Sequence, residues 1–156
     1  MKNAVDWKGA SQFSGPEQSP GFLLWQISTQ WRRQIETALS ALGLTHTQFV
    51  LLASVGWLVK EGNAVSQVEV ARHCKTDITM TSQVLRTLEK KGYIERSHRQ
   101  GNERSKFSSI TEAGRQLIEE ALPLVETVDR EFFGKLEKDT EKCVEILQKL
   151  ISQQIG

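Results

Sequence analysis

The chain has 156 residues, of which 38% are apolar and 25% charged, and its formal net charge is +1. This length predicts a single domain with helical extensions, and the composition is typical of a folded protein rather than a disordered one. The longest nearly apolar stretch, Phe49 to Val59, is too short to cross a bilayer, and no signal-peptide pattern opens the chain. We therefore expect no membrane partner. Because the two cysteines cannot form a disulfide framework, a reduced, cytoplasmic protein is expected.

The first 43 residues predict an arm followed by a helix. Residues 1–20 contain two of the three prolines and several Ser and Gln residues, which is typical of a flexible N-terminal arm. Residues 21–43 carry apolar side chains at helical spacing and end at Gly43, which favours termination of a helix. The apolar positions are Leu24, Ile27, Trp31, Ile35, Ala38 and Leu42.

Three capped helices are predicted next. The segments Thr45–Gln48 and Ser66–Glu69 both have the Ser/Thr-x-x-Glu/Gln pattern of a capping box, which begins a helix. The second of these helices is short and ends near Cys74. A third helix, 77–91, begins at Asp77 as N-cap and is stopped by Gly92. We expect its inner face to consist of Ile78, Thr81, Val84, Leu85 and Leu88.

A basic β-hairpin and two further helices complete the chain. Residues 93–96 and 106–110 alternate like strands, and residues 99–103 predict the hairpin tip. Thr111 caps a long helix that Pro123 should kink, and a last helix carries apolar residues as far as Ile155. The predicted fold class is therefore mainly α with a small β-hairpin wing. Its winged helix-turn-helix domain is 44–111, and helical segments 21–43 and 112–156 flank this domain.

The charge is unevenly distributed, and this points to a nucleic-acid partner. The window from Ser66 to Thr111 carries +4, while the rest of the chain carries −3. The outward face of helix 77–91 combines hydroxyl, amide and basic side chains, which can bond bases and phosphates. A solvated polar face is the alternative, but the ordered set of capped helices and basic hairpin favours double-stranded DNA. The candidate DNA-binding residues are Thr79, Ser82, Gln83, Arg86, Lys90, Arg99, Arg104 and Lys106.

From about Phe22 to Gln153 the sequence resembles the MarR family of bacterial transcription regulators. The most specific pieces are LEKKGYIER at residues 88–96 and ITEAG at residues 110–114. The resemblance implies a homodimer that binds pseudo-palindromic duplex DNA through helix 77–91 and the 97–106 wing. It also implies that Arg104 enters the minor groove. Two positions depart from the family pattern, since Asn102 replaces the usual Asp and Gln83 replaces a frequent basic residue.

Dimerisation also has support from the residues themselves. The amphipathic helices predicted at 22–42, 112–136 and 140–155 have too little of the lobe left to cover them. A twofold axis would bury them and present two recognition helices to successive major grooves. The alternative is packing of these helices against their own lobe.

The resemblance further implies a repressor released by a small aromatic or lipophilic effector. Candidate residues for this ligand site are Trp25, Trp31, Phe49 and Trp57. An aromatic stripe at helical spacing is, however, more often ordinary core.

Other classes of function have weaker support. The sequence has no phosphate-binding glycine loop, no nucleophile–base pair and no pair of histidines four residues apart, so we expect no enzyme, no metal and no cofactor. Cys74 lies beside His73 and Lys75 and could be redox active, although a packing role is favoured. The main rival is a winged-helix module for protein–protein contact, which would need exposed apolar anchors on helix 77–91.

Overall fold

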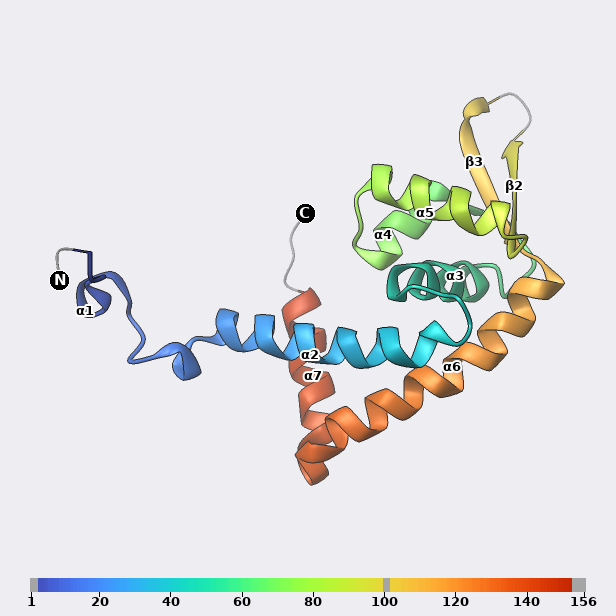
Figure 1. Ribbon diagram of the computed structural model, residues 1–156. Coiled ribbons are helices and arrows are strands. Elements are labelled where there is room, and N and C mark those ends of the chain that lie inside the picture. The colour runs from blue at the N-terminus through green and yellow to red at the C-terminus, as the bar shows by residue number, and fades with distance from the viewer. Residues whose placement is uncertain (1–2, 100–101, 153–156) are drawn as a thin grey trace. The chain divides into compact units, whose positions relative to one another are not determined.

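The computed structural model describes residues 3–99 and 102–152, without the side chains of residues 98–105. The chain divides into two compact units, residues 1–34 and residues 35–156. Helix α2 (Pro20–Ser40) contributes to both units. The element order and labels are those of Figure 1.

The first unit contains short helical elements with exposed apolar side chains. Helix α1 (Trp7–Ala10) is capped by Asp6, which accepts a hydrogen bond from the Gly9 amide at 3.1 Å. The 3-10 helix η1 (Pro16–Gln18) follows, and α2 begins at Pro20. The flexibility predicted for residues 1–20 stays a prediction, although two short helical elements lie within this segment.

The second unit is built on three short helices that pack against one another. These are α3 (His46–Leu58), α4 (Gln67–Cys74) and α5 (Ile78–Lys90). Both predicted capping boxes are confirmed, and Asp77 caps α5 by accepting from the Met80 amide at 2.8 Å. The helices enclose a core of fully buried aliphatic side chains. They include Ile35, Leu39, Leu51, Leu52, Val55, Val70, Leu85 and Leu88.

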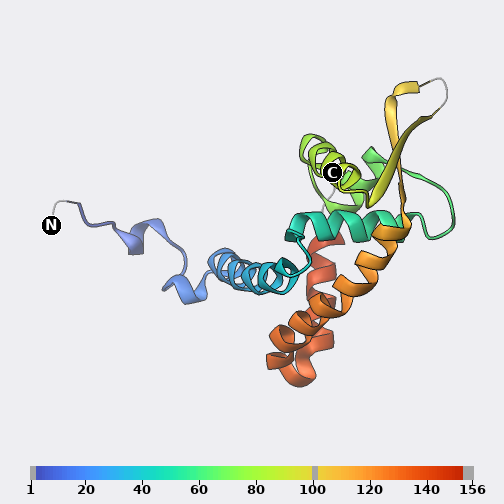
Figure 2. The ribbon, with the colours of Figure 1, turned by 45° about the vertical axis from the view of Figure 1, so that its right-hand side comes forward.

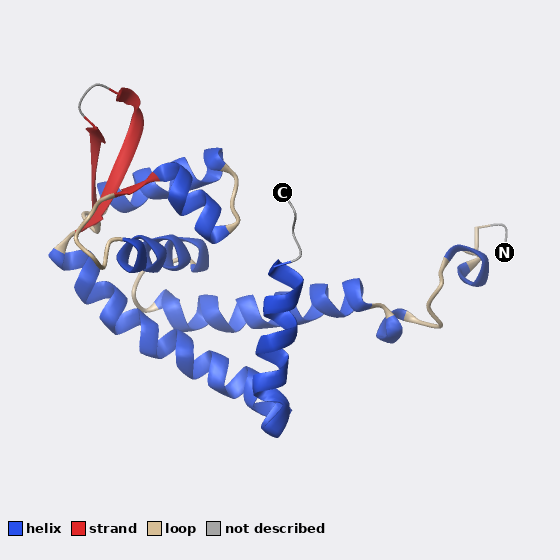
Figure 3. Ribbon diagram, turned by 180° about the vertical axis from the view of Figure 1, so that it is seen from behind, coloured by secondary structure: helices blue, strands red, loops and turns tan. Residues whose placement is uncertain are grey.

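A three-stranded antiparallel sheet lies at one edge of these helices, as Figures 2 and 3 show. Its strands are β1 (Val65–Ser66), β2 (Ile94–Arg99) and β3 (Asn102–Ile110), in the order β1-β3-β2. The hairpin is confirmed, but its strands are longer than predicted, since Arg99 pairs with Asn102. The expected tip of 99–103 is therefore wrong at both ends, because the backbone ladder continues where side-chain alternation has stopped. Residues 100 and 101 lie outside the described residues.

Two close contacts join the hairpin to the helix that follows it. Gly92 has a φ of +84°, which glycine adopts without strain, and its carbonyl accepts a 2.7 Å hydrogen bond from the Thr111 hydroxyl. A Cβ at Gly114 would lie 2.1 Å from the Tyr93 carbonyl oxygen. The TEAG sequence therefore both caps the next helix and allows it to approach the base of the wing.

The first C-terminal helix extends away from the base of the wing, and the second turns back from its far end (Figure 1). Helix α6 (Glu112–Phe133) continues through Pro123 and ends earlier than predicted, at the 3-10 segment η2 (Gly134–Asp139). Glu137 in this segment has a φ of +50°, so the chain changes direction here. Helix α7 is Thr140–Ser152, and Ile155 lies outside the described residues.

Some burial predictions are wrong. Ile78, expected on the inner face of α5, is 46% exposed, because it lies at the edge of that face, on the same side of the helix as half-buried Ser82. The core interpretation also fails for two tryptophans, since Trp25 is 68% and Trp57 is 60% exposed. Within the described residues, no helix combines the length and hydropathy that a membrane crossing requires.

Candidate nucleic-acid interface

Helix α5 separates a buried face from a polar exposed face. Thr81, Leu85 and Leu88 are buried, as predicted. The Thr81 hydroxyl donates to the Asp77 carbonyl at 2.8 Å and lies 2.7 Å from the Thr76 hydroxyl, so this polar group inside the lobe is satisfied. The opposite face contains the five predicted DNA-binding residues of this helix. Of these, Thr79, Gln83, Arg86 and Lys90 are exposed and Ser82 is half-buried.

A shallow hollow lies between this face and the start of α4. It has a volume of about 290 Å³ and is lined by Gln67, Ile78, Thr79, Ser82, Gln83 and Arg86. The structure thus brings four of the predicted residues together around one concave surface. It also adds Gln67 and Ile78, which sequence reasoning did not include in the site.

Gln67 is held by the wing. The Nη2 group of Arg96 donates to the Oε1 atom of Gln67 at 2.7 Å. The Nε and Nη1 atoms of Arg96 are buried, with no hydrogen-bond partner among the described residues. Burial lowers the pKa of Arg96, whereas the nearby carboxylate of Glu89 opposes this shift and Arg86 adds to it. The guanidinium is therefore a cation held beneath the candidate DNA face.

The wing places its basic residues on two paired strands. Arg99 lies at the end of β2, and Arg104 and Lys106 lie on β3. Lys106 is half-buried, and it pairs in register with His98. The side chains of Arg99 and Arg104 lie outside the described residues, so their contact with DNA stays a prediction.

Comparison with known proteins decides the family. The MarR family model matches residues 44–106. The chain is 44% identical to the uncharacterized HTH-type transcriptional regulator YdcH of Bacillus subtilis (strain 168), over 96% of this chain and all of that protein. It is 31% identical to the HTH-type transcriptional repressor Rv2887 of Mycobacterium tuberculosis, over 74% of this chain and 81% of that protein. The chain belongs to the MarR family.

Solved MarR structures share the fold. The Rv2887 complex with DNA matches with a TM-score of 0.66 and 28% identity, over 85% of this chain and 97% of that one. CouR from Rhodococcus jostii RHA1, bound to p-coumaroyl-CoA, matches with a TM-score of 0.78 over 92% of this chain and 99% of that one. Its identity of 20% supports the fold alone. The predicted winged helix-turn-helix fold and MarR membership are thus confirmed, and the curated relatives are transcriptional regulators.

The predicted effector residues of this MarR protein occupy different environments. Trp25 and Trp31 lie in the first unit, whereas Phe49 and Trp57 lie in the second. Phe49 is buried in the core, Trp31 is half-buried and the other two are exposed. The Lys60 ammonium lies 3.4 Å from the centre of the Trp57 ring, in a cation–π contact. Whether these four side chains share a pocket stays a prediction.

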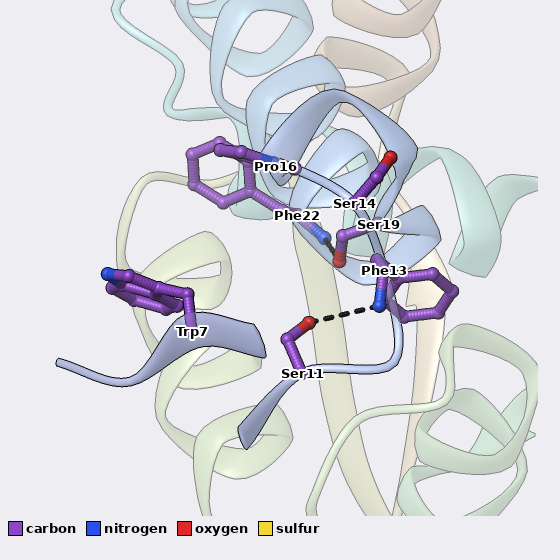
Figure 4. A pocket seen from close by; sticks show the side chains of 8 residues that line it. Trp7, Ser11, Phe13, Ser14, Pro16, Ser19 and Phe22 are labelled. Carbon is purple, nitrogen blue, oxygen red and sulfur yellow. Dashed lines mark hydrogen bonds between the residues drawn. The ribbon is translucent and has the colours of Figure 1, made fainter. Parts of the chain in front are cut away.

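The N-terminal unit contains an apolar hollow of its own. Its volume is about 720 Å³, and it is lined by Trp7, Ser11, Phe13, Ser14, Gly15, Pro16, Ser19 and Phe22. Figure 4 shows the rings of Trp7 and Phe22 on one side and that of Phe13 on the other. The Ser11 and Ser19 hydroxyls accept from the amides of Phe13 and Phe22, which fixes the local turns. Sequence reasoning missed this hollow, because residues 1–20 were expected to be flexible.

Metal and thiol chemistry gain no support from the described residues. They contain no group of three His, Cys, Asp or Glu side chains that could hold a metal ion. Cys74 is half-buried, and its thiol donates to the Ser54 hydroxyl at 3.2 Å. This contact fits the packing role expected for Cys74.

Proposed function

We propose that this MarR protein binds duplex DNA by placing α5 in the major groove. The single observation that carries the proposal is the exposed polar face of a rigidly capped helix. Positions 79, 82, 83, 86 and 90 carry hydroxyl, amide or basic side chains and no acid. This arrangement suits a surface that approaches phosphates. The capped N-terminus and buried Leu85 and Leu88 hold the helix in place against the lobe.

Each side chain has a role that follows from its chemistry. Gln83 can form a bidentate contact with adenine, and Arg86 with guanine or a phosphate. Thr79, Ser82 and Lys90 suit phosphates. On the wing, Arg99, Arg104 and Lys106 are proposed to follow the backbone and the minor groove, with Arg104 inserted in the groove.

A salt titration tests this division of roles. The probe is a duplex selected by the wild-type protein from random-sequence DNA. Gln83→Ala should relax sequence preference at one position per half-site, with a loss of about 1–3 kcal/mol and an unchanged salt slope. Lys90→Ala should weaken binding to all sequences and reduce the salt slope by about one unit. Gln116→Ala, on α6 and far along the chain, is the control. Unchanged affinity and slope in both α5 variants would exclude α5 as the DNA-binding helix.

We further infer that the protein is a homodimeric repressor acting in the cytoplasm and released by a small aromatic or lipophilic ligand. In support, the relative Rv2887 is named a repressor, and a solved structure describes its complex with salicylic acid. That structure matches with 29% identity over 96% of its chain. The free energy that couples effector binding to DNA binding is typically about 1–3 kcal/mol.

Tryptophan fluorescence offers a direct test of the ligand. Exposed Trp25 and Trp57 should report binding of phenolic acids such as salicylate. A ligand that changes the fluorescence should also weaken operator binding, since the two effects are reciprocal. A broad phenolic screen without any fluorescence change would remove the basis of the proposal.

A winged-helix module for protein contact retains one observation in its favour. Ile78 is an exposed apolar side chain beside the hollow on α5. One aliphatic side chain among polar residues also fits contact with a thymine methyl group. The DNA titration above separates the two functions.

A further inference from the structure

The contact between Arg96 and Gln67 joins two elements that are far apart in the sequence. Arg96 lies on β2 and pairs in register with Ser108 of β3, which pairs in turn with Val65 of β1. Gln67 begins α4, immediately after β1. The sheet therefore brings the guanidinium to the first residue of α4, where Nη2 meets Oε1 at 2.7 Å.

The chemistry of the two groups fixes the orientation of the amide. A guanidinium has only donors, so the Gln67 side chain must present its oxygen to Arg96. The Nε and Nη1 atoms of Arg96 are buried without an acceptor among the described residues, so the Gln67 oxygen is the acceptor that the guanidinium uses. A flipped amide would place donors against donors and leave the whole cation unsatisfied.

The other end of the amide consequently points away from Arg96. Among the described residues, Gln67 Nε2 has no hydrogen-bond acceptor, and Gln67 is only half-buried. Gln67 also lines the hollow shared with Thr79, Ser82 and Gln83. Its two N–H groups are thus available at the surface where acceptors of a DNA strand would arrive.

We propose that Arg96 is a positioning residue that holds the Gln67 amide with its nitrogen outward, to donate to a phosphodiester oxygen. The inference rests on the proposed DNA-binding function. Gln67 lies outside α5, beside the face that would enter the groove, and this position favours the backbone bordering the groove over a base edge. Arg96 contributes its geometry and need not touch DNA.

Three variants and one matched control test the proposal. Gln67→Ala removes the donor. Gln67→Glu keeps an acceptor for Arg96 but has no N–H group. Arg96→Met removes the guanidinium and frees the amide to rotate. Gln116→Glu, at an exposed position of α6, matches the charge change of Gln67→Glu at a site away from the proposed interface.

The expected results separate donation from folding. Gln67→Ala should bind the selected duplex about 10-fold more weakly with an unchanged salt slope, because a neutral donor to a phosphate is lost. A methylphosphonate scan of the duplex should show one phosphate per half-site that weakens wild-type binding and no longer affects Gln67→Ala. Gln67→Glu should keep the wild-type melting temperature or exceed it, yet bind DNA more weakly than either Gln67→Ala or Gln116→Glu.

A double-mutant cycle tests the role of Arg96. Arg96→Met should weaken DNA binding in the wild-type background and cause no further loss in the Gln67→Ala background. An equal loss in both backgrounds would mean that Arg96 acts independently of Gln67, which overturns the positioning role. If Arg96→Met does not fold, Gln67→Glu decides, because wild-type affinity in that variant contradicts an outward N–H donor.

The test also distinguishes this inference from the proposed function. Two results would overturn the phosphate contact. One is a Gln67→Ala protein that binds the duplex with wild-type affinity. The other is a Gln67→Ala protein whose base preference is relaxed but whose binding is still weakened by methylphosphonate at the same phosphates as wild type. If Gln83→Ala and Lys90→Ala weaken binding in the same assay, the DNA face stands and only the Gln67 inference fails. If these α5 variants are also silent, the proposed face itself is wrong.

Discussion

At the scale of single residues, side-chain caps determine where the helices of the lobe begin. Thr45, Ser66, Asp77 and Thr111 each accept a hydrogen bond from an amide three residues later. Each bond satisfies a backbone donor that the first turn leaves without a partner. Ser66 bears directly on the contact proposed for Gln67, because it fixes the start of α4 and therefore the position of that residue.

Removing the Ser66 cap should destabilise the lobe. Its hydroxyl accepts from the Glu69 amide at 3.1 Å, and Glu69 accepts from the Ser66 amide at 2.8 Å. Ser66→Ala should reduce the free energy of unfolding by about 1 kcal/mol, measured by urea denaturation. Ser40→Ala, at the exposed end of α2, should stay within about 0.5 kcal/mol of wild type. Equal effects of the two changes would contradict a specific cap.

The same cap predicts that the stability of the fold depends on pH in the acidic range. The hydrogen bonds from the Ser66 amide and hydroxyl lower the pKa of Glu69 below its ordinary value of 4.5. A depressed pKa in the folded state means that this stabilisation is complete above the unfolded value and is lost as the pH falls through the folded value. Glu69→Gln should therefore flatten the fall in melting temperature below pH 4.5. Glu120→Gln, an exposed change of equal charge on α6, is the control, and identical acid profiles for the two variants would refute the assignment.

At the scale of elements, the sequence predicted boundaries well where local chemistry sets them. Capping boxes marked the starts of α3 and α4, and the Asp77 cap and Gly92 marked the two ends of α5, since these signals act over three or four positions. The lengths of β2 and β3 were underestimated, because cross-strand pairing extends a ladder beyond its alternating pattern. Neither exposed Ile78 nor the contact between Gln67 and Arg96 could be predicted, since both depend on tertiary packing.

The junction between the wing and α6 offers a sharp test at this scale. A Cβ at Gly114 would lie 2.1 Å from the Tyr93 carbonyl, which belongs to the backbone and cannot rotate away. Gly114→Ala should therefore lower the free energy of unfolding by about 1–3 kcal/mol. Gly134→Ala provides the matched control, because its φ is −60° and no atom lies within 4 Å of the added carbon. It should be neutral or stabilise the protein by up to about 1 kcal/mol, as followed by thermal unfolding. Tolerance of both substitutions would contradict close packing at the junction.

At the scale of the whole molecule, the apolar residues of α7 point to a second copy of the chain. None of its described residues is buried, and one face carries exposed aliphatic side chains. These are Val144, Ile146, Leu147, Leu150 and Ile151. A continuous exposed apolar face of this kind is typical of an interaction surface. Self-association would cover it and would place two α5 helices on one duplex.

A charge on this face should therefore separate dimerisation from folding. Leu150 is 65% exposed in the protomer, so Leu150→Glu should leave the melting transition of the lobe nearly unchanged. In sedimentation, the same variant should run as a monomer. Loss of the second lobe removes bivalent binding, and affinity for a palindromic duplex should fall about 100-fold or more, whereas affinity for a single half-site should not change. The neighbouring change Lys149→Gln alters the charge equally on the opposite side of the helix and should retain both the dimer and DNA affinity. A Leu150→Glu protein that stays dimeric would show that this face of α7 does not form the interface. A monomeric variant with wild-type affinity for the palindromic duplex would show that DNA binding does not need two lobes.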